Sequence, residues 1–156
     1  MRKFFFGLGV LAAVLIVAGG VGFFFLFRSG AELDRMSKAY VDKSVVAITA
    51  NWDVDELWKR ASPHLRQITN ENQIRGLFDA AKDALGPLVE FRGSRGDAII
   101  SLKDRSVSAD YLAVAHYRNG DASMRIALVK RGDTWMIEGF RINSNALMKR
   151  LVGMRS

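Results

Sequence analysis

The order of the expected elements is that of an α+β protein in which one transmembrane helix precedes a soluble domain. Two observations carry this prediction: an uncharged apolar run at residues 4–27, and helix-periodic segments that give way to strand-like alternation near residue 88. Helices followed by a run of antiparallel strands pack on one face of the sheet. We therefore expect a membrane anchor at residues 1–28 and a soluble α+β domain at residues 29–156, with three helices on a bent antiparallel sheet.

The apolar run, Phe4–Phe27, is long enough to cross a membrane. It has 24 residues, it follows Arg2 and Lys3, and Arg28 ends it. A helix rises about 1.5 Å per residue, so a bilayer core of about 30 Å needs about 20 apolar residues. Ser29-Gly30-Ala31 offers small residues for cleavage, but the apolar region of a cleaved signal peptide has only about 7–15 residues. An uncleaved signal anchor is therefore expected.

Small residues recur within this run at the spacing of helix–helix contacts. They form the pairs Gly9 with Ala13 and Ala18 with Gly22, which let two membrane helices approach closely. Self-association or contact with another membrane protein through the span is expected from these pairs. Glycine and alanine are also common in spans that make no such contact.

Composition restricts the chemistry of the domain. The chain has 23 Lys+Arg, 16 Asp+Glu, a formal charge of +7 and no cysteine. The charge suits anionic lipids or an acidic partner. Disulfides, zinc–thiolate sites, thiol catalysis and a lipid anchor on cysteine are excluded. The basic residues are scattered among acidic ones, which argues against nucleic-acid binding.

The sequence of the first half of the domain predicts helices. Residues Glu32–Ala50 carry apolar residues at helical spacing. Asp53 with Glu56 forms a capping box for a short helix at Val54–Ala61, which Ser62-Pro63 is expected to stop. Asn70 then caps a third helix, whose apolar face includes Leu77 and Phe78, and Gly86-Pro87 ends it.

The second half alternates with period two. The expected strands are Leu88–Arg92, Asp97–Leu102, Val107–Arg118, Asp121–Lys130 and Thr134–Asn143. Asn119-Gly120 predicts a hairpin turn. Gly139 predicts a bulge that shifts the register of the last strand. Ser144 is expected to cap a short final helix.

Particular segments resemble the nuclear transport factor 2-like superfamily of cone-shaped α+β domains, above all its small membrane-anchored bacterial members. The resemblance rests on Trp52-Asp53-Val54-Asp55, Leu85-Gly86-Pro87-Leu88, the hairpin at residues 113–122 and the segment at residues 135–140. It implies a cone with an interior. It also implies a small bacterial protein held by a single anchor. The layout of a signal anchor favours a single-pass protein of the inner membrane with its N-terminus in the cytoplasm and its domain in the periplasm, although basic residues flank the span on both sides. The superfamily contains enzymes, ligand-binding domains and interaction domains, so the fold does not select among these functions.

Candidate site residues follow from the aromatic and ionisable side chains. The residues that could line a cone interior are Trp58, Phe78, Tyr111, His116, Trp135 and Phe140. An enzyme would use His116, Tyr117 or Glu138, but no catalytic constellation is evident and no catalytic residue is assigned. With only two histidines, in different elements, no metal site is expected, and no cofactor is implied.

The sequence thus favours an accessory or assembly protein rather than an enzyme. Its span and domain are expected to dock on a larger membrane protein complex. The alternative is a binding module that holds a hydrophobic or lipid-like ligand in the cone interior.

Overall fold

The computed structural model describes residues 30–153. The chain divides into two units, residues 1–35 and residues 36–156. Of the first unit, residues 30–35 are described; they are helical, and Arg35 pairs with Glu32 at 2.6 Å. The second unit carries the sheet and the remaining helices.

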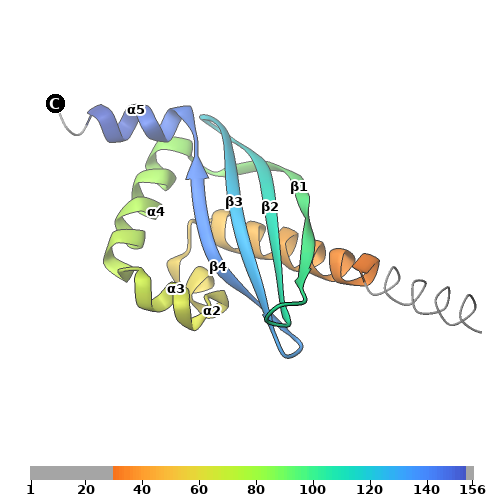
Figure 1. Ribbon diagram of the computed structural model, residues 1–156. Helices are drawn as coiled ribbons and strands as arrows, with labels where there is room; N and C mark the ends of the chain where they lie inside the picture. The colour runs from red at the N-terminus through yellow and green to blue at the C-terminus, as the bar shows by residue number, and fades with distance from the viewer. Residues whose placement is uncertain (1–29, 154–156) are drawn as a thin grey trace, which may run out of the picture. The chain divides into compact units, whose positions relative to one another are not determined.

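The second unit is an α+β structure with a four-stranded antiparallel sheet in the order β1-β2-β3-β4, which confirms the predicted class (Figure 1). It begins with helical residues 36–49. The elements that follow are α2 (Val54–Arg60), α3 (Pro63–Ile68), α4 (Glu71–Leu85), β1 (Leu88–Ser101), β2 (Ser106–Tyr117), β3 (Gly120–Arg131), β4 (Thr134–Asn143) and α5 (Asn145–Gly153).

Among residues 30–153, no helix is long and apolar enough to cross a membrane. The span predicted at Phe4–Phe27 lies outside the described residues. The expected helix-packing residues Gly9, Ala13, Ala18 and Gly22 lie there too, so the anchor stays a prediction.

The helices pack on one face of the sheet, which we call the inner face. Alternation places Tyr111, Ala113 and Tyr117 of β2 on this face, where all three are buried. The Ser37 hydroxyl lies 2.8 Å from the Tyr111 hydroxyl, which ties the first helix to the middle of β2. Trp52 joins helices to sheet, with its ring centroid 5.6 Å from that of Phe78 and 5.5 Å from that of Tyr117. The opposite, outer face carries no described helix.

The helix caps are predicted well, with one helix missed. The Asp53 side chain accepts hydrogen bonds from the backbone of Asp55 and Glu56, and Asn70 caps α4. The prediction that Ser62-Pro63 stops the second helix is confirmed, because α2 ends at Arg60 with Ala61 as its C-cap. The helix that begins at the same place was missed. Ser62 caps α3, and Pro63 occupies its first turn, where the missing N–H is no loss and the fixed φ favours a helix.

The first strand is one element, not two. The predicted division into strands at Leu88–Arg92 and Asp97–Leu102 is wrong, because Leu88–Ser101 runs continuously along β2 with a register shift between Phe91 and Ser94. Gly93 has φ +88° at this irregularity, and Gly96 brings its backbone against that of Asp110. The glycines therefore serve a bulge and a close strand contact rather than a turn.

Two further local predictions have different outcomes. The bulge near Gly139 is confirmed: the register shifts opposite Ala127 and Leu128, leaving Glu138 as the extra residue. The hairpin turn is displaced by one residue, because Tyr117 pairs with Gly120 and the turn consists of Arg118 and Asn119.

The start of α5 also differs from expectation. The backbone carbonyl of Ser144 accepts a bond from Met148, but the buried Ser144 hydroxyl has no partner among the described residues. Ser144 therefore does not cap this helix with its side chain.

Candidate functional site

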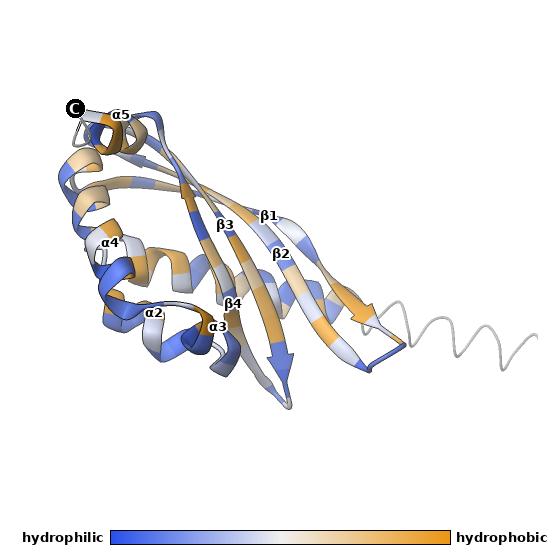
Figure 2. Cartoon of the chain, turned by 60° about the vertical axis from the view of Figure 1, so that its left-hand side comes forward, coloured by the Kyte–Doolittle hydropathy of each residue, from blue (hydrophilic) through white to orange (hydrophobic). Residues whose placement is uncertain are grey.

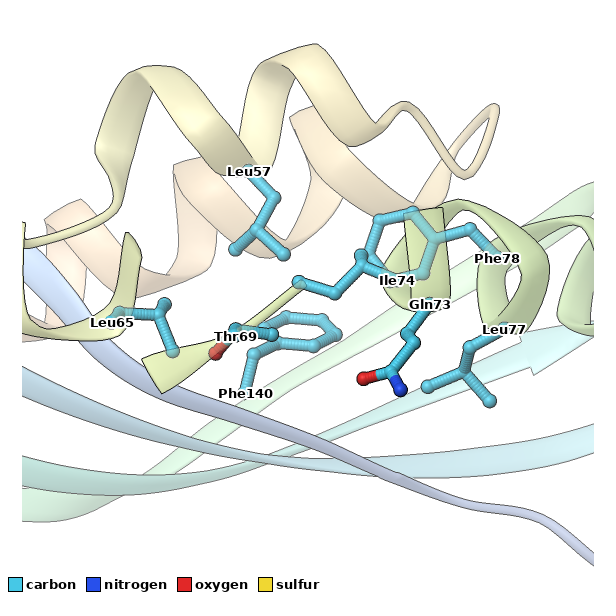
Figure 3. Close-up of a pocket in the computed structure, with 8 residues that line it drawn as sticks. All are labelled: Leu57, Leu65, Thr69, Gln73, Ile74, Leu77, Phe78 and Phe140. Atoms are coloured by element: carbon cyan, nitrogen blue, oxygen red, sulfur yellow. The ribbon is translucent and has the colours of Figure 1, made fainter. Parts of the chain in front are cut away.

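An apolar pocket opens between α2, α3, α4 and the inner face of β4. Its volume is about 240 Å³. Figure 3 shows side chains from all four elements converging on it. Its lining consists of Leu57, Leu65, Thr69, Gln73, Ile74, Leu77, Phe78 and Phe140.

Two local features of the sequence build this lining. Ile74, Leu77 and Phe78 share one face of α4 because residues three and four apart lie together on a helix. On β4 the extra residue Glu138 changes the alternation, so that Phe140 joins Ile137 on the inner face. The Phe140 ring then lies 6.0 Å from that of Phe78, between centroids, which closes one side of the pocket.

The polar groups of the pocket are few and uncharged. Thr69 and Gln73 contribute a hydroxyl and an amide, and Gln73 is exposed. No ionisable side chain is part of the lining. Such a pocket can select an apolar group by shape and hold one polar end of it, but its lining offers no proton donor or acceptor for acid–base chemistry.

The structure brings only two of the six predicted lining residues together. Phe78 and Phe140 line the pocket. Tyr111 lies in the packed core against Ser37. Trp135 is buried, with an indole N–H that has no partner among the described residues, and Trp58 is half-buried on α2. His116 lies on the outer face.

His116 belongs to a small charged cluster at the β2–β3 hairpin. Its Nδ1 lies 2.6 Å from Asp121 Oδ1, and Arg92 approaches the same carboxylate at 3.5 Å. The hydrogen bond from His116, with a smaller contribution from Arg92, lowers the pKa of Asp121. All three side chains are partly exposed, which is typical of a surface ion pair.

The candidate residues for catalysis are spread over the sheet. Tyr117 is in the core, where burial raises its pKa. His116 points to the opposite face. Glu138 lies at the bulge, more than about 20 Å along the sheet from Tyr117 at about 3.3 Å per residue, and its nearest ionisable partner is His64, at 4.0 Å. No two of these three residues meet. Within residues 30–153, no group of three His, Asp or Glu side chains could hold a metal ion.

A second feature lies on the outer face. One row of neighbouring residues crosses all four strands: Arg95, Leu112, Arg125 and Arg141. We call it the arginine row. Leu112 is 41% exposed within it. Arg125 donates to Asp110 at 3.0 Å, a bond that raises the pKa of Arg125, whereas Arg95 and Arg141 make no ion pair with any described residue.

Beside this row is a hollow of about 400 Å³. Its floor is Ala127 and Gly139, which pair with each other, and Asp110, Arg125 and Arg141 surround it. Small residues at the floor leave room for a side chain from outside. Arg125 is already paired with Asp110, whereas Arg141 makes no ion pair with any described residue, so its guanidinium favours an incoming carboxylate.

Sequence reasoning missed both surfaces in part. The residues Leu57, Leu65, Thr69, Gln73, Ile74 and Leu77 were not expected in the pocket, because two of its walls depend on α3 and on the bulge. The arginine row depends on the register of all four strands. Alternation alone placed Leu112 opposite Tyr111 but could not align Arg95 with it across an irregular strand.

Comparison of the chain with protein-family models, with curated proteins and with solved structures finds no match.

Proposed function

We propose that this chain is a single-span accessory protein of the bacterial inner membrane that docks on a larger membrane protein complex. The arginine row is the observation that carries this proposal. Three guanidinium groups share a row with an exposed leucine, on a sheet face that no described helix covers. Arginine beside an apolar side chain is the composition of the energetically important centre of many interfaces.

The chemistry of the row indicates the kind of partner. Arg95 and Arg141 have no acidic partner among the described residues, so two cations remain for groups from outside. A carboxylate entering the hollow above Ala127 and Gly139 would meet Arg125 and Arg141, and an apolar neighbour of that carboxylate would cover Leu112. The partner is thus a membrane protein with an exposed acidic and apolar segment.

The predicted span supports the same function. It would hold the domain at the membrane, and its pairs Gly9–Ala13 and Ala18–Gly22 offer a second contact with a membrane helix. The resemblance to the nuclear transport factor 2-like superfamily, whose members include interaction domains, is compatible with it. We also infer a periplasmic domain, from the layout of a signal anchor.

Charge reversal within the row tests the proposal. The tagged full-length chain is purified from native membranes in mild detergent, and co-purifying proteins are identified by mass spectrometry. The double variant Arg95→Glu/Arg141→Glu is expected to lose a stoichiometric membrane partner that the parent chain retains. The matched control is Lys43→Glu/Lys149→Glu, which changes the net charge equally at lysines elsewhere on the chain. A partner retained by both variants, or no partner at all, contradicts the proposal.

The pocket supports a second candidate function, the binding of a hydrophobic ligand. Its volume of about 240 Å³ is somewhat below the range of about 300–1,000 Å³ that is usual for drug-sized ligands, so a short acyl chain or a single ring would fit. Leu77→Trp would fill its rim, whereas Met148→Trp adds the same side chain on α5. Organic extraction of the purified chain should release a ligand from the parent and from Met148→Trp but not from Leu77→Trp. A parent chain without ligand contradicts this candidate.

A further inference from the structure

The end of β1 and the turn that follows it expose three large apolar side chains. Ile99 is 58% exposed, Ile100 is 44% exposed and Leu102 is 89% exposed. We call residues 99–105 the β1–β2 tip. The neighbouring hairpin end, between β3 and β4, carries Arg131, Gly132 and Asp133 instead and no large apolar side chain. Of the two hairpins whose turns lie at the same end of the sheet (Figure 1), only the one between β1 and β2 exposes apolar side chains in this way.

In the same turn the acidic side chain is hydrogen-bonded, whereas the two basic side chains beside it make no ion pair with any described residue. The Asp104 carboxylate accepts hydrogen bonds from the Ser106 hydroxyl at 2.8 Å and from the Ser106 backbone at 3.3 Å. Asp104 is thus engaged in holding the turn. Lys103 and Arg105, on either side of it, make no ion pair with any described residue. Apolar side chains next to free cations are the composition that binds the interface of an anionic membrane.

The helical residues 36–49 run along the sheet, beginning on the side of the β1–β2 tip. Ser37 contacts Tyr111, Asp42 accepts a hydrogen bond from Ser94 farther along, and Trp52 reaches Tyr117 at the other end of β2. Within residues 36–153, the chain therefore enters at the side of the sheet where β1 turns into β2. Figure 2 shows the hydrophobic end of β1 at that side.

The distances are compatible with one membrane surface for both. Ser37 follows Phe27, the end of the predicted span, by ten residues, and ten residues cover about 15 Å as a helix. Residues 30–37 are helical. From Tyr111 to Ser106, β2 covers about 17 Å towards the tip. The tip can therefore reach the surface from which the span emerges.

We propose that the β1–β2 tip inserts Ile99, Ile100 and Leu102 into the interface of the bilayer that holds the anchor, with Lys103 and Arg105 on anionic head groups. This inference rests on the membrane anchor of the proposed function and adds a second membrane contact. Two contacts would fix the orientation of the domain, and with it the direction in which the arginine row faces.

Because the chain has no cysteine, single-cysteine variants can be labelled cleanly with a fluorophore that responds to polarity. Labels are placed at Leu102 and Ile99 in the tip, at Asp133 in the polar hairpin as the matched control, and at Leu15 in the predicted span. The full-length chain is reconstituted in vesicles of phosphatidylcholine and phosphatidylglycerol, with and without spin-labelled lipid as quencher.

At Leu102 and Ile99 we expect blue-shifted emission that spin-labelled lipid quenches, less than at Leu15 but clearly more than at Asp133. Water-like, unquenched emission at both tip positions overturns the inference, as does blue-shifted emission that lipid does not quench, which would mean that protein covers the tip. The label at Leu15 reports separately on the anchor: its failure to be quenched counts against the proposed function, whatever the tip labels show.

Discussion

Asp121 shows how a single side chain on the outer face responds to its surroundings. Its carboxylate accepts from His116 at 2.6 Å and lies 3.5 Å from Arg92. These contacts lower its pKa in the folded chain, the hydrogen bond from His116 contributing most. A carboxyl group whose pKa is lower in the folded state stabilises the fold above its unfolded pKa of about 3.9 and loses that contribution as the pH falls through its folded pKa.

The variant Asp121→Asn should therefore lower the melting temperature slightly near neutral pH. The difference from the parent should shrink below pH ~4, as the parent carboxylate becomes protonated. The effect should be small because the pair is exposed. The control is Asp79→Asn on the exposed side of α4, which removes no ion pair with a described residue and should leave the melting temperature near neutral pH unchanged. A difference that grows with acidification would contradict the assigned contacts.

His116 also illustrates what a residue's neighbours in sequence do not reveal. The expectation that it lines an interior together with Tyr111 is wrong, because strand alternation puts the two residues on opposite faces of β2. Its partner Asp121 follows from a hairpin turn that begins one residue earlier than Asn119-Gly120 suggests. That shift of one residue pairs His116 with a carboxylate at the surface.

At the scale of the element, β1 depends on Gly96. A Cβ atom there would lie 1.9 Å from the Asp110 backbone oxygen, and this atom belongs to the partner strand and cannot move without disturbing the pairing. Gly96→Ala should therefore lower the free energy of unfolding by about 1–3 kcal/mol. Denaturation of the full-length chain, followed by tryptophan fluorescence, measures this, since Trp52 and Trp135 are buried.

Gly76→Ala is the matched control for that prediction. Gly76 lies inside α4, and a Cβ atom at this position would have no neighbouring atom within 4 Å. Alanine should therefore raise the free energy of unfolding by about 0.5–1 kcal/mol. Equal stability of Gly96→Ala and the parent chain would contradict the described close contact between β1 and β2.

The elements that sequence reasoning predicted are those with strong local signals. Asp53 and Asn70 start α2 and α4, Gly86 ends α4, and the bulge near Gly139 follows from two apolar pairs out of phase. The elements that it missed contain residues that are compatible with two different local structures. Ser62-Pro63 can end one helix or begin the next, and Gly93 with Gly96 can form a turn or a bulge. The length of β2 decides the second case, because it offers partners along the whole of β1.

The candidate surfaces were harder to predict than the elements, since they arise only from packing. Phe78 and Phe140 were expected to line one interior, and they do line the pocket. Tyr111 was expected to line the same interior. Its hydroxyl instead lies beside the Ser37 hydroxyl of the first helix, and the side chain belongs to the packed core.

At the scale of the whole molecule, the inner and outer faces of the sheet have different uses. The helices cover the inner face and leave an apolar pocket at its side, whereas the outer face presents the arginine row and its hollow. The proposed function assigns docking to the outer face and anchoring to the predicted span. Neither assignment requires chemistry at the sheet, which agrees with the separation of His116, Tyr117 and Glu138.

If a membrane protein covers the outer face, site-specific photo-crosslinking from that face should capture it. A photoreactive phenylalanine derivative replaces Leu112, in the arginine row, or Met148, which is similarly exposed on α5, in the full-length chain in native membranes. We expect one discrete adduct with a membrane protein from position 112, absent from position 148 and lost with Arg95→Glu/Arg141→Glu. No adduct from position 112, or the same adducts from both positions, would contradict the proposal.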